Sequence, residues 1–583
     1  MDAVFSIEVM MVNAPLRRLG FNALFNAMLC ATASAACPVA PCIAPANTEA
    51  SALFAAVEQL YPQFFFPSAA TQALGSGSDA ALYRSYPDTG GYGLGAYQGG
   101  LWYAVAGNWT RFSSLDQGNQ TFCSGSCLGP IAAQGSFRGN IVLGVPEDTS
   151  IKVSVFAPDQ TGTVYLAYGT TPGSYAQQTT PVALSAGKPL TIALAGLTPN
   201  ARYYYRLYLQ SADSNEAVPT DEHSFHTARP VGSTFTFTLQ ADSHMDENSA
   251  VAQYRRTLAN ISADAPDFHI DLGDTFMCEK HYAPLSPTIP PAATQAQVQW
   301  RYWFERGNFG LMAHSVPLFL VNGNHEGEAG WLNIGGAQNL ANWADAARQQ
   351  FFVNPVPDRF YSGDDTVDPN VGQRAGWYSW QWGDALFVAL DPYWYTGKRT
   401  NKGWDITLGT SQFHWLEQTL AASKAKFKFV FLHSLVGGLD GQMRGGIEAA
   451  PFYEWGGMND DGVTSGFASQ RPGWSMPIHA LLKRYGVTAV FHGHDHVYVK
   501  QDLDGIVYQE VPQPSAVNNN SGANLAKAYH YTSGTIVSSS GHVRVTVSPT
   551  QVKVDYVRSW LPQNETAGHK NGEIADSWTV SAP

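Results

Sequence analysis

The sequence is poor in charge and has no long apolar run. Only 14% of its 583 residues are charged, while 44% are hydrophobic, and this balance excludes a largely disordered chain. Beyond residue 37 no segment reaches about 18 uninterrupted apolar residues, so we expect no membrane span. The net charge is −13 and no basic run follows Arg17 and Arg18, which argues against nucleic acid as a partner.

The sequence also lacks the motifs of several common enzyme classes. It has neither a GxxxxGK[ST] phosphate loop nor a GxSxG elbow, so the usual nucleotide-binding and serine-hydrolase sites are excluded. It has no CxxC pair, so we expect no cysteine zinc site. Of the six cysteines, Cys30 lies in the apolar stretch near the N-terminus and would be removed with a signal peptide. Cys37 with Cys42 and Cys123 with Cys127 could close small disulfide loops, which leaves Cys278 as the odd cysteine.

The N-terminus has the features of an export signal. Arg17 and Arg18 precede a short apolar stretch at 19–31, and small residues follow at 33–35. We therefore predict a signal peptide at 1–36 and a secreted or periplasmic protein, the alternative being an ordinary amphipathic helix. The residues before Cys37 do not begin with an aliphatic side chain, so we expect no lipid anchor at this cysteine.

The chain is too long for one hydrophobic core, and its composition changes along its length. An aromatic and glycine-rich stretch at 37–135 predicts a small N-terminal module of hairpins, whose aromatics either bind a ligand or fill a small core. Short alternating runs at 136–230 predict an antiparallel fibronectin III-like β-sandwich. Alternating strands and helices at 231–560 predict an α/β catalytic domain, and 561–583 reads as a C-terminal tail.

Five predicted strands of the α/β region end in side chains of the same kind. The segments LQADSH, IDLGD, NGNHE, FLHS and GHDH supply Asp242, His244, Asp274, Asn324, His325, His433, His494 and His496. Active sites of α/β proteins form at the carboxyl ends of strands. Carboxylate, imidazole and amide oxygen suit ions such as Mn, Fe or Zn. One ion does not need this many ligands, whereas two ions that share an aspartate do.

The order DxH, GD, GNHE, His and GHxH resembles that of the calcineurin-like metallophosphoesterase superfamily. With the preceding sandwich, residues 140–555 look most like its purple-acid-phosphatase-like branch. The resemblance implies an αββα sandwich, two divalent metal ions (Mn, Fe or Zn), and a metal-bridging hydroxide that attacks phosphorus directly. One ion would be held by Asp242, His244 and His496, and the other by Asn324, His433 and His494, with Asp274 bridging them. His325 would bind or protonate the phosphoryl group.

The sequence departs from the purple enzymes at two positions. The first motif is DxH where they have DxG, and Met277 stands where they have a tyrosine. We therefore expect divalent ions, no tyrosinate-to-iron colour, and activity at neutral to alkaline pH. Four further polar residues match no ligand position and are expected to support the ligands: Asp271, Glu326, His492 and Asp495.

The resulting hypothesis is an exported phosphatase that acts on a small phosphorylated substrate, with phosphomonoesters favoured. A phosphodiesterase of the same superfamily is the first alternative, and a non-catalytic surface-binding protein is the second. The insertions 276–300, 326–376 and 437–475 would cap the pocket and decide the substrate. Within them His281 and Arg444 are either phosphate contacts or ordinary surface side chains. The sequence predicts no oligomeric state.

Overall fold

The computed structural model describes residues 137–583, apart from 138, 159, 212–214, 245–248, 282–290, 400–402, 441 and 517–520. It also describes the strands of a small sheet between residues 72 and 111. The expected signal peptide and the side chain of His281 lie outside the described part. In the part that is described, every helix is too short or too polar to cross a membrane.

The small N-terminal sheet is an antiparallel meander of five strands in the order β1-β2-β3-β4-β5. Its strands are β1 (Gln72–Leu74), β2 (Ala81–Tyr86), β3 (Tyr92–Tyr97), β4 (Gly100–Val105) and β5 (Asn108–Arg111). These are the hairpins that the glycine turns predict. A ligand for this module stays a prediction.

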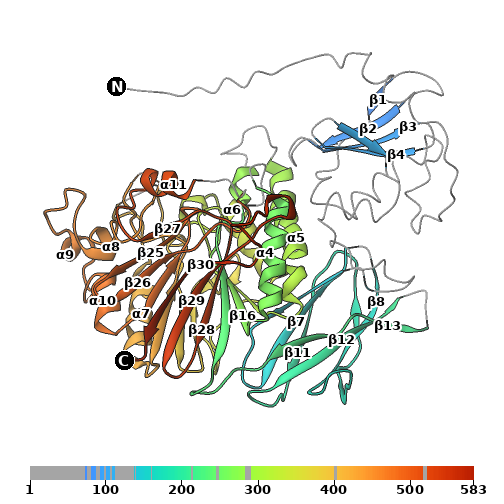
Figure 1. Ribbon diagram of the computed structural model, residues 1–583, viewed down its shortest axis with the longest axis horizontal. Coiled ribbons are helices and arrows are strands. Elements are labelled where there is room, and N and C mark those ends of the chain that lie inside the picture. The colour runs from blue at the N-terminus through green and yellow to red at the C-terminus, as the bar shows by residue number, and fades with distance from the viewer. Residues whose placement is uncertain are drawn as a thin grey trace.

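The next region folds into two antiparallel sheets (Figure 1). One has the order β11-β7-β6 and the other the order β10-β8-β12-β13, with β9 and β14 also paired to it. The strands are β6 (Asn140–Gly144), β7 (Ser150–Phe156), β8 (Gly162–Gly169), β9 (Gln177–Gln178), β10 (Val182–Leu184), β11 (Leu190–Ala195), β12 (Arg202–Ser211), β13 (Ala217–Pro219) and β14 (His223–His226). The hydroxyl of Tyr203 accepts a hydrogen bond from the Thr198 amide at 2.9 Å, the contact made by a tyrosine corner. The described region is therefore a β-sandwich, and its assignment to the fibronectin type stays a prediction.

Two larger mixed sheets form the catalytic region. The first has the order β17-β16-β15-β28-β29-β30, in which β15, β16 and β17 are parallel. The second has the order β18-β21-β22-β23-β24-β26-β25-β27, in which β22, β23, β24 and β26 are parallel. Their strands are β15 (Phe235–Gln240), β16 (Phe268–Asp271), β17 (Leu318–Leu320), β18 (Ser362–Gly363), β21 (Tyr378–Trp382), β22 (Ala385–Ala389), β23 (Phe427–Phe431), β24 (Ala489–His492), β25 (Tyr498–Leu503), β26 (Ile506–Glu510), β27 (Thr535–Val537), β28 (Gly541–Val547), β29 (Gln551–Arg558) and β30 (Ile574–Ser581), while β19 (Val367–Asp368) pairs only with β20 (Gly372–Gln373).

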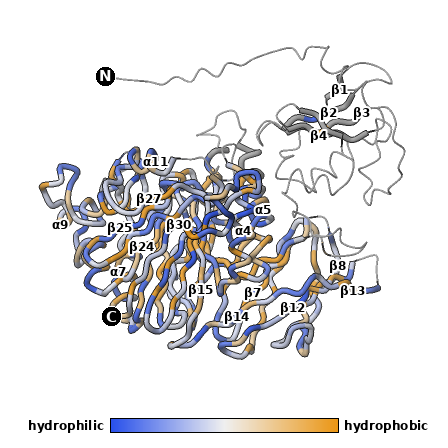
Figure 2. Tube along the Cα trace, in the orientation of Figure 1, coloured by the Kyte–Doolittle hydropathy of each residue, from blue (hydrophilic) through white to orange (hydrophobic). Residues whose placement is uncertain are grey.

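Alternate residues of these strands belong to two different cores, which shows the layers. In β23, Phe429 and Phe431 pack between the two sheets, whereas Val430 packs with helical side chains on the outer face. In β22, Phe387 faces inward and Val388 outward in the same way. In Figure 2, hydrophobic segments run through the region of the two large sheets, around the labels β15, β24 and β25. Helices cover the outer faces, so the predicted αββα sandwich is confirmed.

Helices lie between the strands of this region, as the predicted α/β alternation requires. The larger ones are α4 (Val251–Asp264), α5 (Pro291–Ala313), α6 (Leu340–Phe351), α7 (Thr410–Ala422) and α10 (Ile478–Arg484), and the shorter ones are α8 (Tyr453–Gly456), α9 (Phe467–Gln470) and α11 (Gly522–Ala528). On the side of the second sheet, α7 and α10 bury Leu416 and Leu481 in the same core as Val430. On the side of the first sheet, Tyr254 of α4 accepts a hydrogen bond from Gln240 of β15 at 3.1 Å.

The expectation of a C-terminal tail at 561–583 is wrong for residues 574–581, which form β30. β30 pairs antiparallel with β29 along its length and extends the first sheet. Asp576 accepts a hydrogen bond from Tyr498 at 2.8 Å, and Trp578 donates one to Gln509 at 2.9 Å. The strand is hard to recognise from sequence because an edge strand with one exposed face carries few apolar residues.

A buried ionic cluster braces the chain beyond the GNHE segment. Arg348 donates to both carboxylate oxygens of Glu328, at 2.5 and 2.8 Å, and to Asp345 at 2.8 Å. Arg374 donates to Glu328 at 2.9 Å and to Asp391 at 3.3 Å. All five side chains are almost completely buried, so removing one partner would leave an uncompensated charge in the interior.

Two histidines meet where the sandwich packs on the catalytic region. The ring of His223 in β14 lies 4.3 Å from the ring of His314, measured between centroids. Tyr205 of the sandwich donates to the His314 carbonyl at 2.6 Å. Burial, reinforced by the charge of His314, lowers the pKa of His223 to about 3, and burial also lowers the pKa of His314.

These lowered pKa values predict that acid destabilises this contact. As the pH falls below 6.5, the ordinary pKa of histidine, the two histidines bind protons in the unfolded chain but not in the folded protein. The free energy of unfolding therefore decreases. We expect His223→Gln to lose less melting temperature than the wild type between about pH 7 and pH 5. Thermal unfolding at several pH values measures this. His414→Gln on the exposed side of α7 should keep the wild-type pH dependence, and the same slope in all three proteins would contradict the prediction.

Candidate metal centre

The predicted ligands lie where strands of both sheets end. β15, β16 and β17 of the first sheet lead to four of them, and β23 and β24 of the second sheet lead to three. Parallel strands present their carboxyl ends at one edge of a sheet. The described ligand atoms form three groups: Asp242, His244 and His496; His244, Asp274 and His325; and Asp274, His433 and His494. Within each group these atoms lie within 4.8 Å of one another.

The turns that follow these strands have unusual backbone conformations. Five residues have left-handed φ values between 47° and 86°: Asp242, His244, Asp274, His494 and His496. Each such residue costs about 1–3 kcal/mol, and this strain concentrates at functional sites. The turns direct side chains from different strands toward one region.

Two glycines of the motifs allow the turns to approach one another. A Cβ on Gly323 would lie 2.3 Å from Oδ1 of Asp274, and a Cβ on Gly493 would lie 2.7 Å from Oδ2 of Asp242. Neither position can hold a side chain without moving a carboxylate. The glycines of GNHE and GHDH are therefore explained by close packing around the two aspartates.

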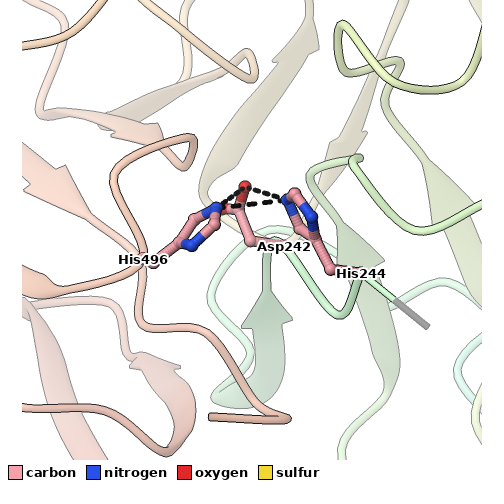
Figure 3. Close-up of side chains that lie close together, drawn as sticks. All are labelled: Asp242, His244 and His496. Atoms are coloured by element: carbon pink, nitrogen blue, oxygen red, sulfur yellow. Dashed lines mark hydrogen bonds and ion pairs between the residues drawn. The ribbon is translucent and has the colours of Figure 1, made fainter. Parts of the chain in front are cut away.

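The first group lies between β15 and the turn after β24 (Figure 3). Oδ1 of Asp242 is 3.5 Å from Nε2 of His244 and 3.4 Å from Nε2 of His496. The two imidazole nitrogens are 3.1 Å apart. All three side chains point toward a common centre, which is the arrangement that the first predicted metal requires.

The second group is centred on Asp274. Its Oδ2 atom lies 3.0 Å from Nε2 of His433, and that nitrogen lies 3.1 Å from Nδ1 of His494. The same Oδ2 atom lies 3.5 Å from Nε2 of His244 in the first group. Asp274 is thus within reach of both groups, as its predicted bridging role requires.

Two oxygens of the centre are buried and receive no hydrogen bond from the described residues. They are Oδ1 of Asp242 and Oδ1 of Asn324. Buried polar atoms nearly always have a partner. A divalent cation at each predicted site would satisfy one of these atoms, and the set of carboxylate, imidazole and amide donors suits such an ion. The residues present therefore fit the implied metals.

The electrostatics of the centre also favour positive charge. Burial alone would lower the pKa of both His244 and His433, but the nearby carboxylates of Asp242 and Asp274 raise these values to about 10 and about 9. The same histidines hold the pKa of Asp242 and Asp274 below its ordinary value, against the effect of burial. A cation entering this centre would displace protons from the imidazoles.

His325 lies at the edge of the centre. Its Nε2 atom is 3.8 Å from Oδ2 of Asp274, and 24% of its side chain is exposed. Its Nδ1 atom contacts the carboxylate of Glu279, in the short helix η4 (Cys278–His281). Burial lowers the pKa of His325 to about 4, whereas the carboxylate of Asp274 opposes that shift. The position suits a phosphoryl contact, and the predicted role of His325 stays a prediction.

The four polar residues expected to support the ligands contact the loops that carry them. Glu326 accepts hydrogen bonds from the amides of Gly323, Asp274 and Thr275 at 2.5–2.9 Å. Asp271 accepts from the Gly273 amide at 3.1 Å and from Thr275 Oγ1 at 2.8 Å. His492 and the Asp495 amide both contact Glu510, at 2.7 and 2.9 Å.

Two carboxylates at the centre were not found from the sequence. Glu279 lies in an insertion and Glu510 ends β26, so neither belongs to a motif of the centre. The only signal for Glu279 is that it follows the GD aspartate by five positions. Met277, in the position of the purple enzymes' tyrosine, is buried. Arg444 contacts the GHDH turn, where it donates to the His494 carbonyl and to Asp495.

Comparisons with known proteins concern the family and the fold of this region. Residues 235–498 match the family model of the calcineurin-like phosphoesterases. The structure of PhoD superposes with a TM-score of 0.55 at 17% identity and covers 78% of this chain and 92% of PhoD. A purple acid phosphatase from yellow lupin (Lupinus luteus) seeds gives a TM-score of 0.48 at 15% identity, with 84% of this chain and 79% of that chain covered. A search of curated proteins gave no match. Residues 235–498 thus belong to the calcineurin-like phosphoesterase family.

Proposed function

We propose that the protein is an exported phosphoric ester hydrolase that uses two divalent metal ions and favours phosphomonoesters. One observation carries the proposal: Oδ2 of Asp274 lies close to imidazoles of both groups, 3.5 Å from Nε2 of His244 and 3.0 Å from Nε2 of His433. A single ion does not require a carboxylate in this position. The signal peptide predicted at 1–36 supports export.

The residues of the chain have distinct tasks in this proposal. Asp242, His244 and His496 hold one ion, and Asn324, His433 and His494 hold the other, with Asp274 common to both. When bound, such ions acidify a water molecule and polarise the phosphoryl oxygens. His325, at the exposed edge, contacts the phosphoryl group or, where it is protonated, gives a proton to the leaving oxygen.

The choice of metal follows from the first motif and from Met277. His244 supplies a neutral ligand, and no phenolate is available at position 277. Both sites then suit Mn, Fe or Zn in the divalent state. We expect a colourless protein that is most active at neutral to alkaline pH.

Metal analysis combined with hydrolysis of two model esters tests the function. The protein is loaded with Mn²⁺ or Zn²⁺, the bound ions are counted, and turnover is measured on an aryl phosphate and on the bis-aryl phosphate. Two ions and faster release from the monoester support the proposal. Faster release from the diester would instead establish the phosphodiesterase, and two bound ions without hydrolysis of either ester would favour a binding protein.

A further inference from the structure

The imidazole of His494 has a partner on each of its nitrogens. Nδ1 faces Nε2 of His433 at 3.1 Å, and Nε2 lies 2.5 Å from the backbone carbonyl of Gln442. A carbonyl oxygen only accepts hydrogen bonds, so Nε2 of His494 carries the proton. The lone pair of Nδ1 is then directed at the group formed with Asp274 and His433, where a metal ligand needs it.

The Gln442 carbonyl is held in place by a compact segment that we call the His494 brace: Asp440, Gln442, Met443, Arg444 and Gly445. The carboxylate of Asp440 accepts from the amides of Gln442 and Arg444, at 2.8 and 3.2 Å. Met443 takes a left-handed φ of 64°. These contacts fix the shape of the brace, but they do not attach it to the turn that carries His494.

Arg444 and the Gly445 amide make that attachment. The Arg444 guanidinium donates to the His494 carbonyl and, at 3.1 Å, to Oδ1 of Asp495. The Gly445 amide and the Tyr531 hydroxyl donate to the other oxygen of Asp495, at 3.0 and 2.8 Å.

The guanidinium of Arg444 also contacts an aromatic ring. It lies over the ring of Tyr529, 4.4 Å from the centroid, a cation–π contact. Only 14% of the Arg444 side chain is exposed. The contacts of Arg444 thus join the brace to the GHDH turn and to the segment after α11.

We propose that Arg444 is a positioning residue for the second metal, acting through His494, and not a phosphate-binding residue. It holds the brace against the turn, so that the Gln442 carbonyl fixes the tautomer and the orientation of the His494 ring. The inference rests on the proposed function, because it assumes that His494 is a metal ligand. It excludes the other role considered for Arg444, a direct contact to the substrate.

The test compares Arg444→Met with the wild type by titration with Mn²⁺ alone, followed by kinetics on an aryl phosphate at saturating Mn²⁺. Loss of a supporting contact weakens metal binding by about 10–100-fold. We expect this weaker binding for one of the two Mn²⁺ ions, with an unchanged KM for the aryl phosphate. Arg359→Met is the matched control, since Arg359 is 63% exposed and contacts the sandwich carboxylates Glu147 and Asp148. It should bind Mn²⁺ as the wild type does.

A second variant keeps the inference testable if Arg444→Met does not fold. Asp440→Ala removes the cap of the brace from its partly exposed side, so the fold should tolerate it and the same ion should bind several-fold more weakly. Unchanged Mn²⁺ binding in the folded variants, or a raised KM with intact Mn²⁺ binding, would overturn the role of Arg444 and leave the proposed function standing. A wild-type protein that binds neither Mn²⁺ nor Zn²⁺ would overturn both.

Discussion

Replacing Asp274 by asparagine is expected to remove both metal ions and almost all hydrolysis. The carboxylate is buried and lies 3.5 Å from His244 and 3.0 Å from His433. Asparagine has the same shape but no charge, and its amide group can turn a hydrogen-bond donor toward these imidazoles. Loss of a shared ligand should exceed the loss of a supporting residue, so we expect affinity and turnover to fall on the order of 10³-fold or more.

Elemental analysis and titration with Mn²⁺ measure this effect directly. Asp461→Asn is the control, because Asp461 is an exposed carboxylate that caps the amide of Thr464, and asparagine can make the same contact. His433→Ala should also lose metal. A protein with Asp274→Asn that still holds two ions would show that Asp274 is no bridge, and the loss of a single ion would assign it to one site only.

The strand-end ligands could be predicted because each follows an apolar run directly. Phe427–Phe431 is buried on both faces, and His433 comes two residues later. The same local pattern precedes Asp242 and His494. Such a pattern depends only on neighbouring residues, so it is visible in one sequence.

The residues that orient the ligands could not be predicted in this way. Gln442 binds His494 through its backbone carbonyl, which every residue has, so its identity carries no signal. Glu279 and Glu510 reach the centre from an insertion and from β26, and only the tertiary fold shows that they contact His325 and the GHDH turn. The edge strand β30 was missed for a related reason, since its pairing with β29 determines it more than its own composition does.

The structure allows two roles for His325, that of a metal ligand and that of a contact to the phosphoryl group, and a mutation can distinguish them. The ring of His325 lies in one group with His244 and Asp274, so it could hold a metal. However, its Nε2 atom is 3.8 Å from Asp274, farther than the corresponding atoms of His244 and His433, and the ring is partly exposed. Its Nδ1 atom faces Glu279, which would orient the ring toward a bound phosphoryl group.

We therefore expect His325→Ala to keep both metal ions while turnover falls by about 10²–10⁴-fold, the usual contribution of a positioned acid–base group. Glu279→Gln should lower turnover less, because the ring remains but loses its carboxylate partner. Metal content, Mn²⁺ titration and turnover are measured on the same preparations, with the exposed His569→Ala as control. If His325→Ala instead releases an ion, His325 is a ligand and the acid–base role must be assigned to another residue. If His325→Ala keeps both ions and its turnover is unchanged, His325 is neither a metal ligand nor an acid–base group.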